Sequence, residues 1–376
     1  MVDQPLLPLK YGVDYSKLDP FKLIAQKAAD TTNSNAERLG HKFMPESRGE
    51  SAAVFEEEDR YSVKVIEGLG TKNAIADLLK MADGSEHYRA IARCLLATAV
   101  NDGVSLGADI YFVALVINAG GNEWFTDLER AQEFCSGIAE VCNEIGATWG
   151  GGESQTLTEV VFPKSSVHNI AVEGEIKPKS NYTLLRKIEP GDQIVILPSN
   201  GIQTNYLTAC RDLIPRLPKG LSTMVEFDGR TYGEALLSPS YIYQVVVRDL
   251  NHNNLAPVYM SHLTGHGLIK VMRSTAEVGY VIEDLPEIDR NPDQGVAIFK
   301  FIKDWGQLSN EEAYSKMNMG CGFALIVRKE KLAETLKICT KHFPRSWHAG
   351  YVTNGPKRVE LKSIGVTFFE DALQIR

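Results

Sequence analysis

Extended apolar runs alternate with segments of helical spacing between residues 61 and 176, and this alternation limits the possible folds more than any other feature. The extended runs are rich in β-branched and aromatic residues, which favour strands. The intervening segments place apolar residues three and four positions apart, which favours helices with one buried face. Thr126, with Glu129 three positions later, has the spacing of an N-terminal capping box. A mixed α/β (α+β) half is therefore expected, with strands at 61–66, 109–118 and 166–176 and helices at 86–108 and 126–147.

The alternation resumes after residues 177–190, where turn formers and charged residues occur together and mark a domain boundary. This divides the chain into an N-terminal helix and loop segment (1–60), an N-terminal domain (61–178) and a C-terminal domain (179–376). In the first segment, the acidic run Glu56–Asp59 is expected at an exposed hairpin tip. In the third, strands are expected within 192–201, 256–267, 321–329, 347–353 and 357–362, and helices within 205–214, 238–251, 268–276 and 330–343.

Charge and composition argue against two classes of partner. The chain of 376 residues carries a net charge of −8, whereas general binding to nucleic acid requires a basic face. No apolar run approaches the roughly 20 residues of a membrane span, and the N-terminus lacks the pattern of a signal peptide. A cytoplasmic protein without nucleic-acid or membrane partners is expected. Its six scattered cysteines are expected to be buried reduced thiols rather than a zinc or redox centre.

The stretch EGLGTK, which follows the first predicted strand, is a candidate phosphate and metal loop. Gly68 and Gly70 allow the backbone to approach a ligand closely. Glu67 is suited to hold a divalent metal or its waters, and Lys72 to reach a phosphate. The spacing is not that of a Walker A loop, so an ordinary turn at the end of a strand is the alternative interpretation.

Further acids lie near the ends of other predicted elements. Asn101 and Asp102 interrupt an apolar helical pattern, and a buried aspartate requires a partner or a metal. Glu153 follows three glycines in TWGGGES, which is expected to be a loop with exposed backbone, or else a flexible turn. Mg²⁺ prefers one or two carboxylates together with substrate phosphates and waters. Glu67, Asp102 and Glu153 are therefore candidate metal ligands for nucleotide-dependent phosphoryl transfer.

The C-terminal half contains a second kind of candidate, the loop SHLTGHG. His262 and His266 are four positions apart, but the two glycines favour a loop over a helix. No third ligand has a recognisable zinc spacing, so a polar or acid–base role for His262 is the stronger hypothesis.

Taken in order, these motifs resemble those of the aminoimidazole ribonucleotide (AIR) synthase family, the phosphoribosylformylglycinamidine cyclo-ligases of purine synthesis. The matching stretches run from Tyr11 to Val327. They are YGVDYSKLDPF, EGLGTK, AVNDGVSLGADIYF, GGES, SNGIQTNY, LLSPSYIY, HLTGHG and MNMGCGFALIV. Several blocks in register are more specific than any one of them.

The resemblance implies a two-domain fold, with the N-terminal half supplying strands to a β-barrel at a homodimer interface. The C-terminal half would be an α/β layer that covers a cleft. The implied reaction converts formylglycinamidine ribonucleotide to aminoimidazole ribonucleotide, with ATP and Mg²⁺ bound between the halves and across the dimer. ATP would phosphorylate an amide oxygen, an amine would attack the activated carbon, and phosphate would leave.

Position by position, the resemblance implies three groups of site residues. The metal ligands would be Glu67, Asp102 and Glu153, and the catalytic residues Lys72, Asp102 and His262. The residues that bind ATP and line the cleft would be Gly68, Gly70, Thr71, Lys72, Asn101, Gly151, Gly152, Asn205, Thr264 and Gly265.

The chain also departs from the family pattern on the substrate side. Glu67 replaces an aspartate, QTNY (203–206) replaces HSNG, and His266 replaces a glycine. The Gly-rich loop expected near residues 44–53 is reduced to MPESRGESAA. Two alternatives therefore accompany the cyclo-ligase hypothesis: a related ATP-dependent enzyme with a different substrate, and a non-catalytic dimeric protein that binds a nucleotide.

Overall fold

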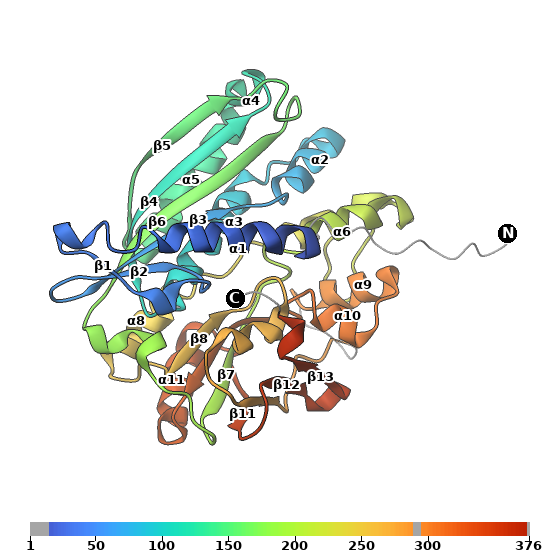
Figure 1. Ribbon diagram of the computed structural model, residues 1–376. Helices are drawn as coiled ribbons and strands as arrows, with labels where there is room; N and C mark the ends of the chain where they lie inside the picture. Colours follow the sequence, from blue (N-terminus) through green and yellow to red (C-terminus); the bar gives the residue numbers. More distant parts are fainter. Residues whose placement is uncertain (1–14, 289–294, 374–376) are drawn as a thin grey trace.

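The computed structural model describes residues 15–288 and 295–373, which form two sheets with helices packed against them (Figure 1). The GVD motif at residues 12–14 lies outside the described residues. Within the described ranges, no helix has both the length and the apolar character needed to cross a membrane.

The first sheet has six strands in the order β1-β2-β3-β6-β4-β5. Only β4 and β5 run parallel; the other neighbours are antiparallel. The predicted strands at 61–66, 109–118 and 166–176 are confirmed, and the acidic run lies at the β2–β3 connection as expected. The strands are β1 (Lys42–Phe43), β2 (Ala53–Glu56), β3 (Tyr61–Gly68), β4 (Asp109–Ala119), β5 (Thr148–Thr156) and β6 (Ser166–Ile176).

The segment TWGGGES is an edge strand, β5, so the expectation of a loop is wrong. The glycines permit close packing of β5 on β4. A Cβ on Gly150 would lie 2.2 Å from the ring of Phe112, and one on Gly152 would lie 2.2 Å from the carbonyl oxygen of Leu115. Propensity disfavours glycine in strands, but close backbone approach requires it here.

Helices cover one face of the first sheet, where α3 and α5 pack side by side on β3, β4, β5 and β6. Helix α5 begins at Leu128, and its N-cap is Asp127, whose carboxylate accepts from the Arg130 N–H at 3.1 Å. The expected cap, Thr126, instead ends the short helix α4 and donates to the Glu123 carbonyl. The helices of this half are α1 (Tyr15–Asp30), α2 (Asn73–Asp83), α3 (Tyr88–Val104), α4 (Glu123–Thr126) and α5 (Leu128–Ile145).

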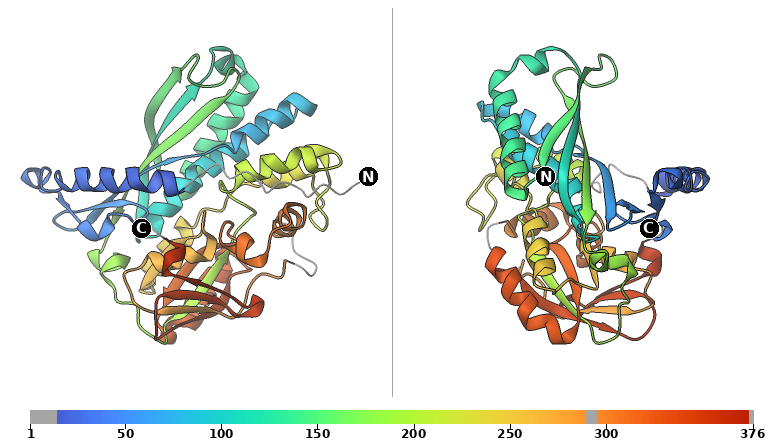
Figure 2. Two further views of the ribbon diagram at one scale, coloured as in Figure 1. Left: turned by 45° about the vertical axis from the view of Figure 1, so that its right-hand side comes forward. Right: turned by 90° about the vertical axis from the view of Figure 1, so that its left-hand side faces the viewer.

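The opposite face of the sheet carries exposed apolar side chains. Ile66 on β3, Val116 on β4 and Val167 on β6 share this face, with exposed fractions of 81%, 37% and 43%. Glu153 pairs with Val116 across β4 and β5, so it projects from the same face. The edge-on view in Figure 2 shows α5 on the other side of these strands.

The second sheet has seven strands in the order β13-β12-β9-β11-β7-β10-β8 and belongs to the C-terminal half. Helices α8 and α11 pack together, and α11 lies on β7 and β11. The strands are β7 (Gln193–Pro198), β8 (Tyr259–His262), β9 (Gly279–Ile282), β10 (Cys321–Val327), β11 (Trp347–Thr353), β12 (Arg358–Leu361) and β13 (Val366–Phe369). The helices are α6 (Leu207–Leu213), α7 (Tyr232–Leu236), α8 (Gln244–His252), α9 (Ala297–Gly306), α10 (Asn310–Tyr314) and α11 (Leu332–His342).

Two helix predictions in this half need correction. The helix expected over 238–251 begins only at Gln244, and the one expected over 268–276 is a 3₁₀ helix, Gly267–Arg273. Elements α7, β9, α9, α10 and β13 were not predicted.

Candidate functional site

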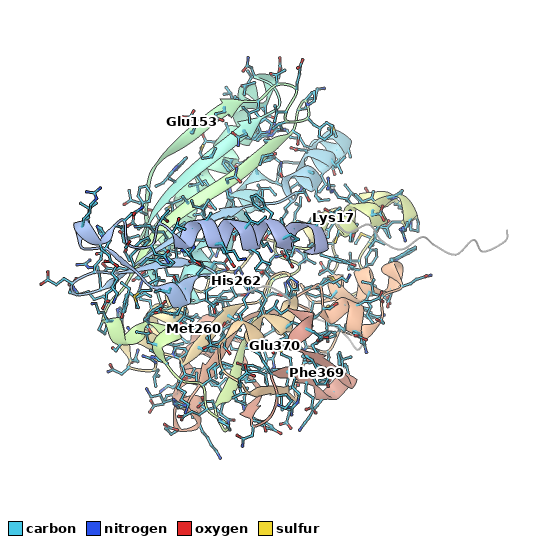
Figure 3. The ribbon with its side chains drawn as sticks, in the orientation of Figure 1. Lys17, Glu153, Met260, His262, Phe369 and Glu370 are labelled. Carbon is cyan, nitrogen blue, oxygen red and sulfur yellow. The ribbon has the colours of Figure 1, made fainter. Side chains whose placement is uncertain are left out.

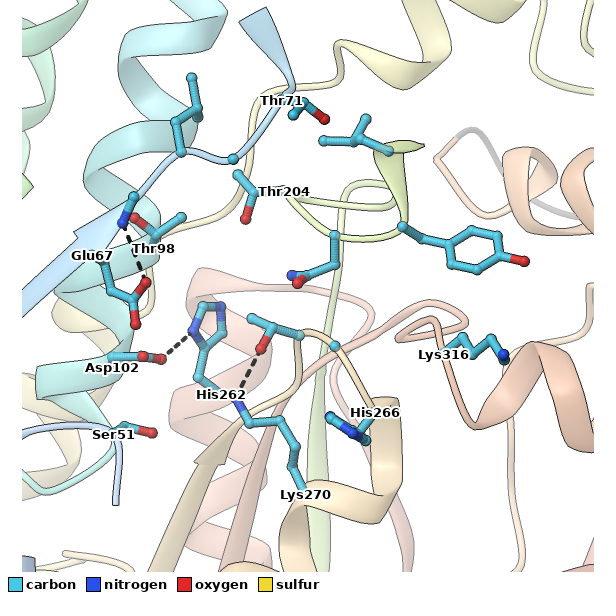
Figure 4. A pocket seen from close by; sticks show the side chains of 18 of the residues that line it. Ser51, Glu67, Thr71, Thr98, Asp102, Thr204, His262, His266, Lys270 and Lys316 are labelled. Atoms are coloured by element: carbon cyan, nitrogen blue, oxygen red, sulfur yellow. Dashed lines mark hydrogen bonds and ion pairs between the residues drawn. The ribbon is translucent and has the colours of Figure 1, made fainter. Parts of the chain in front are cut away.

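A cavity of about 680 Å³ lies between the two halves, at the ends of β3 and β8 (Figure 4). Its charged walls are divided between the halves. The acids that line it come from the N-terminal half, and the lysine and arginine side chains come from the C-terminal half. They are Glu50, Glu67 and Asp102 on one side, and Lys270, Arg273 and Lys316 on the other.

Asp102 and His262 form a buried pair in the wall of the cavity. Asp102 lies in the last turn of α3 and His262 at the end of β8, and Asp102 Oδ1 is 2.8 Å from His262 Nδ1. Burial raises the pKa of Asp102, but the hydrogen bond from His262 and the charge of Lys270 outweigh it, so the pKa lies below its usual range. Burial lowers the pKa of His262. The carboxylate is therefore ionised, and a neutral His262 donates its Nδ1–H to it.

Glu67 faces this pair from the end of β3 (Figure 4). Burial and the charge of Asp102 raise its pKa. Its Oε2 accepts a hydrogen bond from the Gly68 N–H at 3.3 Å. Two carboxylates thus repel one another across a cavity wall, an arrangement that a divalent cation would relieve. Glu67 and Asp102 fit the oxygen ligands that Mg²⁺ prefers, with further positions left for phosphates and waters.

Most of the predicted site residues border this one cavity. The Gly68–Thr71 loop follows Glu67 directly, and Gly70 has a left-handed backbone (φ +73°). The residues that the structure brings together here are Glu67, Gly68, Gly70, Thr71, Asp102, Asn205, His262, Thr264 and Gly265. Segments separated by almost 200 residues of sequence therefore meet, as the family resemblance implied.

Asn101 lies behind His262 rather than in the cavity wall. Its Nδ2 donates to the Tyr241 carbonyl at 2.9 Å, its Oδ1 accepts from the Tyr243 N–H at 2.9 Å, and Nδ2 is 3.5 Å from His262 Nε2. The side chain is fully buried and joins α3 to the segment that precedes α8. Asn101 thus positions His262 and ties the two halves together.

Replacing Asn101 with alanine is expected to lower the free energy of unfolding by roughly 2 kcal/mol or more, because it leaves a buried N–H and a buried C=O without partners. Chemical denaturation measures this loss, and Asn253→Ala, at an exposed site, is the control. A tenfold rise in the KM for ATP with unchanged stability would instead indicate direct ligand contact.

Lys72 is not brought to the cavity. It is fully buried, and its Nζ donates to the Ser238 carbonyl at 2.8 Å and lies 3.1 Å from Cys94 Sγ. Its side chain joins the start of α2 to the C-terminal half. Lys72 is thus a link between the halves, and it does not line the cavity.

Glu153 is also separate from the other two acids. It lies on the outer edge strand β5 (Figure 3). Together with Gly151, Gly152, Leu115 and Trp149 it borders a different hollow. Its carboxylate accepts from the Ser154 N–H at 3.2 Å. Within one chain, the expected group of three acids is therefore reduced to Glu67 and Asp102.

A zinc centre finds no support at the histidine loop. Within the described part of the chain, only Glu86, Asp127 and Glu129 place three metal-ligating atoms within 4.8 Å of one another. Lys80 Nζ already ion-pairs with all three, at 2.6, 2.8 and 3.3 Å. The charge of Lys80 therefore explains why these three acids lie together, with no metal ion needed.

Sequence reasoning missed the cations Lys270 and Arg273. Both lie in the 3₁₀ helix that follows HLTGHG, in a segment interpreted only as a helix. The available signal was the pair of basic residues three positions apart in the otherwise apolar stretch LIKVMR.

Two family models match this sequence and divide it as the two sheets do. The N-terminal domain of AIR synthase related proteins matches residues 49–174, and the C-terminal domain matches residues 189–362. The chain belongs to the AIR synthase family. The resemblance drawn from the motifs is thereby confirmed, as is the mixed α/β fold with two domains.

Relatives in the family share much of this chain's length. A phosphoribosylformylglycinamidine cyclo-ligase of Pyrococcus horikoshii is 29% identical over 358 residues, which are 95% of this chain and 98% of the relative. The cyclo-ligase of Carboxydothermus hydrogenoformans is 30% identical over 306 residues, 79% and 82% of the two chains. The solved hydrogenase maturation protein HypE in complex with ATP has the same fold, with a TM-score of 0.55, 15% identity and coverage of 81% and 83%.

Proposed function

We propose that this protein is an ATP-dependent cyclo-ligase that converts formylglycinamidine ribonucleotide to aminoimidazole ribonucleotide. The observation that carries this proposal is the ionised Asp102 with its neutral partner His262, facing Glu67 in a cavity that both family domains line. Similarity to curated cyclo-ligases over nearly the whole chain supports the same activity. Nucleotide binding is further supported by the HypE structure that contains ATP.

Each group in the cavity has a role in this reaction. Glu67 and Asp102 would hold Mg²⁺, which neutralises phosphate charge when bound. The backbone of the Gly68–Thr71 loop would approach the nucleotide phosphates. His262 Nε2, whose ring is fixed by the Nδ1–H bond to Asp102, would take the proton that the attacking amine loses. The amide oxygen leaves with the phosphoryl group of ATP as inorganic phosphate, so ADP, phosphate and the closed ring are the products.

The direct test incubates the full chain with formylglycinamidine ribonucleotide, ATP and Mg²⁺. ADP and aminoimidazole ribonucleotide are expected in equal amounts, and omission of the ribonucleotide should abolish ADP release. Absence of both products at high enzyme concentration would refute the cyclo-ligase proposal. Nucleotide binding without turnover would then favour the non-catalytic alternative.

Two cavity residues favour a second candidate function. In this alternative the protein is an ATP-dependent enzyme of the same family that acts on another substrate. Tyr206 and His266 both have left-handed backbones (φ +63° and +69°), although neither is a glycine. Such strain clusters at functional sites and requires support from the surrounding structure. Bulky side chains at these positions change the shape of the substrate side, so a screen of other amide substrates would distinguish the two candidates.

We also propose that the protein is a homodimer, assembled through the bare face of the first sheet. Ile66, Val116 and Val167 form an exposed apolar patch there, and monomers rarely leave a broad patch of this kind uncovered. Burial of this face would also bring Glu153 into the interface.

A further inference from the structure

Two cations, Lys270 and Arg273, line the C-terminal side of the cavity, and among the described residues neither forms an ion pair with a carboxylate. Lys270 is 4% exposed, and its Nζ donates a hydrogen bond to Thr264 Oγ1 at 2.8 Å. Arg273 donates to Ser51 Oγ at 3.4 Å, and its buried Nε has no hydrogen-bond partner within residues 15–288 and 295–373. Among the described residues, neither cation has a carboxylate oxygen within the 4 Å of an ion pair.

Such a pair is costly in an empty site. Buried cations are normally paired or fully hydrogen-bonded, and two like charges side by side raise the cost further. The nearby acids belong to the far wall, where Asp102 is bonded to His262 and Glu67 faces Asp102. A ligand that offers several oxygen acceptors and negative charge would satisfy both cations at once.

We infer that Lys270 and Arg273 form an anion subsite that binds a phosphate group of the ligand, with Thr264 holding the lysine in place. The inference rests on the proposed function, in which both ATP and the ribonucleotide carry phosphate. It assigns the C-terminal wall to direct phosphate binding and leaves the metal to the N-terminal wall. A phosphate here would share the cavity with Glu67 and Asp102.

The test measures phosphate binding without metal, so that it does not depend on catalysis. The full chain is titrated calorimetrically with inorganic phosphate in the presence of EDTA. Lys270→Gln and Arg273→Gln are each expected to weaken binding at least tenfold, while Lys329→Gln, at an exposed position, should leave it unchanged. Unchanged affinity in both cavity variants, or no binding by the wild-type chain at millimolar phosphate, would overturn the inference even if cyclo-ligase activity is found.

Competition then identifies the source of the phosphate. Displacement of inorganic phosphate by ADP but not by ribose 5-phosphate assigns the subsite to the nucleotide. The reverse result assigns it to the ribonucleotide substrate. Displacement by neither compound contradicts the inference.

Stability without ligand separates this role from a structural one. Lys270→Gln removes a buried positive charge beside the partly buried Arg273, so it is expected to raise the melting temperature of the ligand-free chain by about 2 °C. It should also abolish the further rise that phosphate gives to the wild type. A purely structural lysine would give a lower melting temperature with phosphate stabilisation retained.

The pH dependence gives an independent readout. Burial and the charge of Arg273 lower the pKa of Lys270 to about 8, with Asp102, Glu67 and Glu50 facing it from the other wall. The affinity for sulfate, which does not itself titrate in this range, should begin to fall near pH 8, by up to about tenfold per pH unit. Lys270→Arg, which keeps its charge, should remove this decline, and a persistent decline would exclude Lys270 as its cause.

Discussion

Replacing Asp102 with asparagine is expected to reduce kcat/KM for the ATP-dependent reaction by about 100-fold or more. The substitution keeps the shape of the side chain but removes the charge that fixes the Nδ1–H form of His262, and general acid–base groups contribute effects of this size. It also removes one of the two carboxylates suited to Mg²⁺. The measurement is steady-state ADP release across a series of Mg²⁺ concentrations.

Asp109→Asn is the matched control for this variant. Asp109 also joins the two halves, through an ion pair with Arg248 on α8, but it lies outside the cavity lining. Its loss should alter stability rather than kcat/KM. If Asp102→Asn retained more than a third of wild-type activity at every Mg²⁺ concentration, neither a metal nor a positioning role for Asp102 would stand.

Replacing Val116 with arginine is expected to convert a dimer into monomers of 41.6 kDa. Val116 lies on the bare face of the first sheet, and an arginine there would bury an unpaired charge against a partner sheet. Light scattering coupled to gel filtration measures the change in mass. A fall in activity that parallels the loss of dimer would place residues of both chains at the site.

Met81→Arg serves as the comparison, because Met81 is 72% exposed on α2, on the helical side of the molecule. This variant should keep the oligomeric state of the wild type. A monomeric wild-type protein, or a Val116→Arg variant with unchanged mass, would rule out dimerisation through this face.

The fold could be predicted where side-chain pattern alone decides local structure. The runs at 61–66, 109–118 and 166–176 are β-rich and bounded by clear turns, and they became β3, β4 and β6. The strand β5 could not be predicted, because its glycines are explained only by the atoms of β4 that they meet. Contacts between distant segments override propensity in such cases.

The sequence predicted several residues of the site, but not which of the predicted side chains point into the cavity. Motif order brought Glu67, Asp102 and His262 into one hypothesis, and all three border one cavity. The sequence could not show that Lys72 turns inward to Ser238, or that strand pairing directs Glu153 to the outer face of the sheet. Lys270 and Arg273 escaped notice because their significance depends on their placement in one cavity with the acids of the N-terminal half, a three-dimensional property.

The division of charge between the cavity walls has a consequence for how such a protein diversifies. The acids are carried by α3, β3 and the loop before β2, all in the N-terminal half, whereas Lys270 and Arg273 are carried by one short 3₁₀ helix. If the proposed assignment holds, substitutions in that helix would change which anion is accepted and leave the acidic wall intact. Ligand preference would then be altered by changing one short segment, while the residues proposed to hold the metal stay in place.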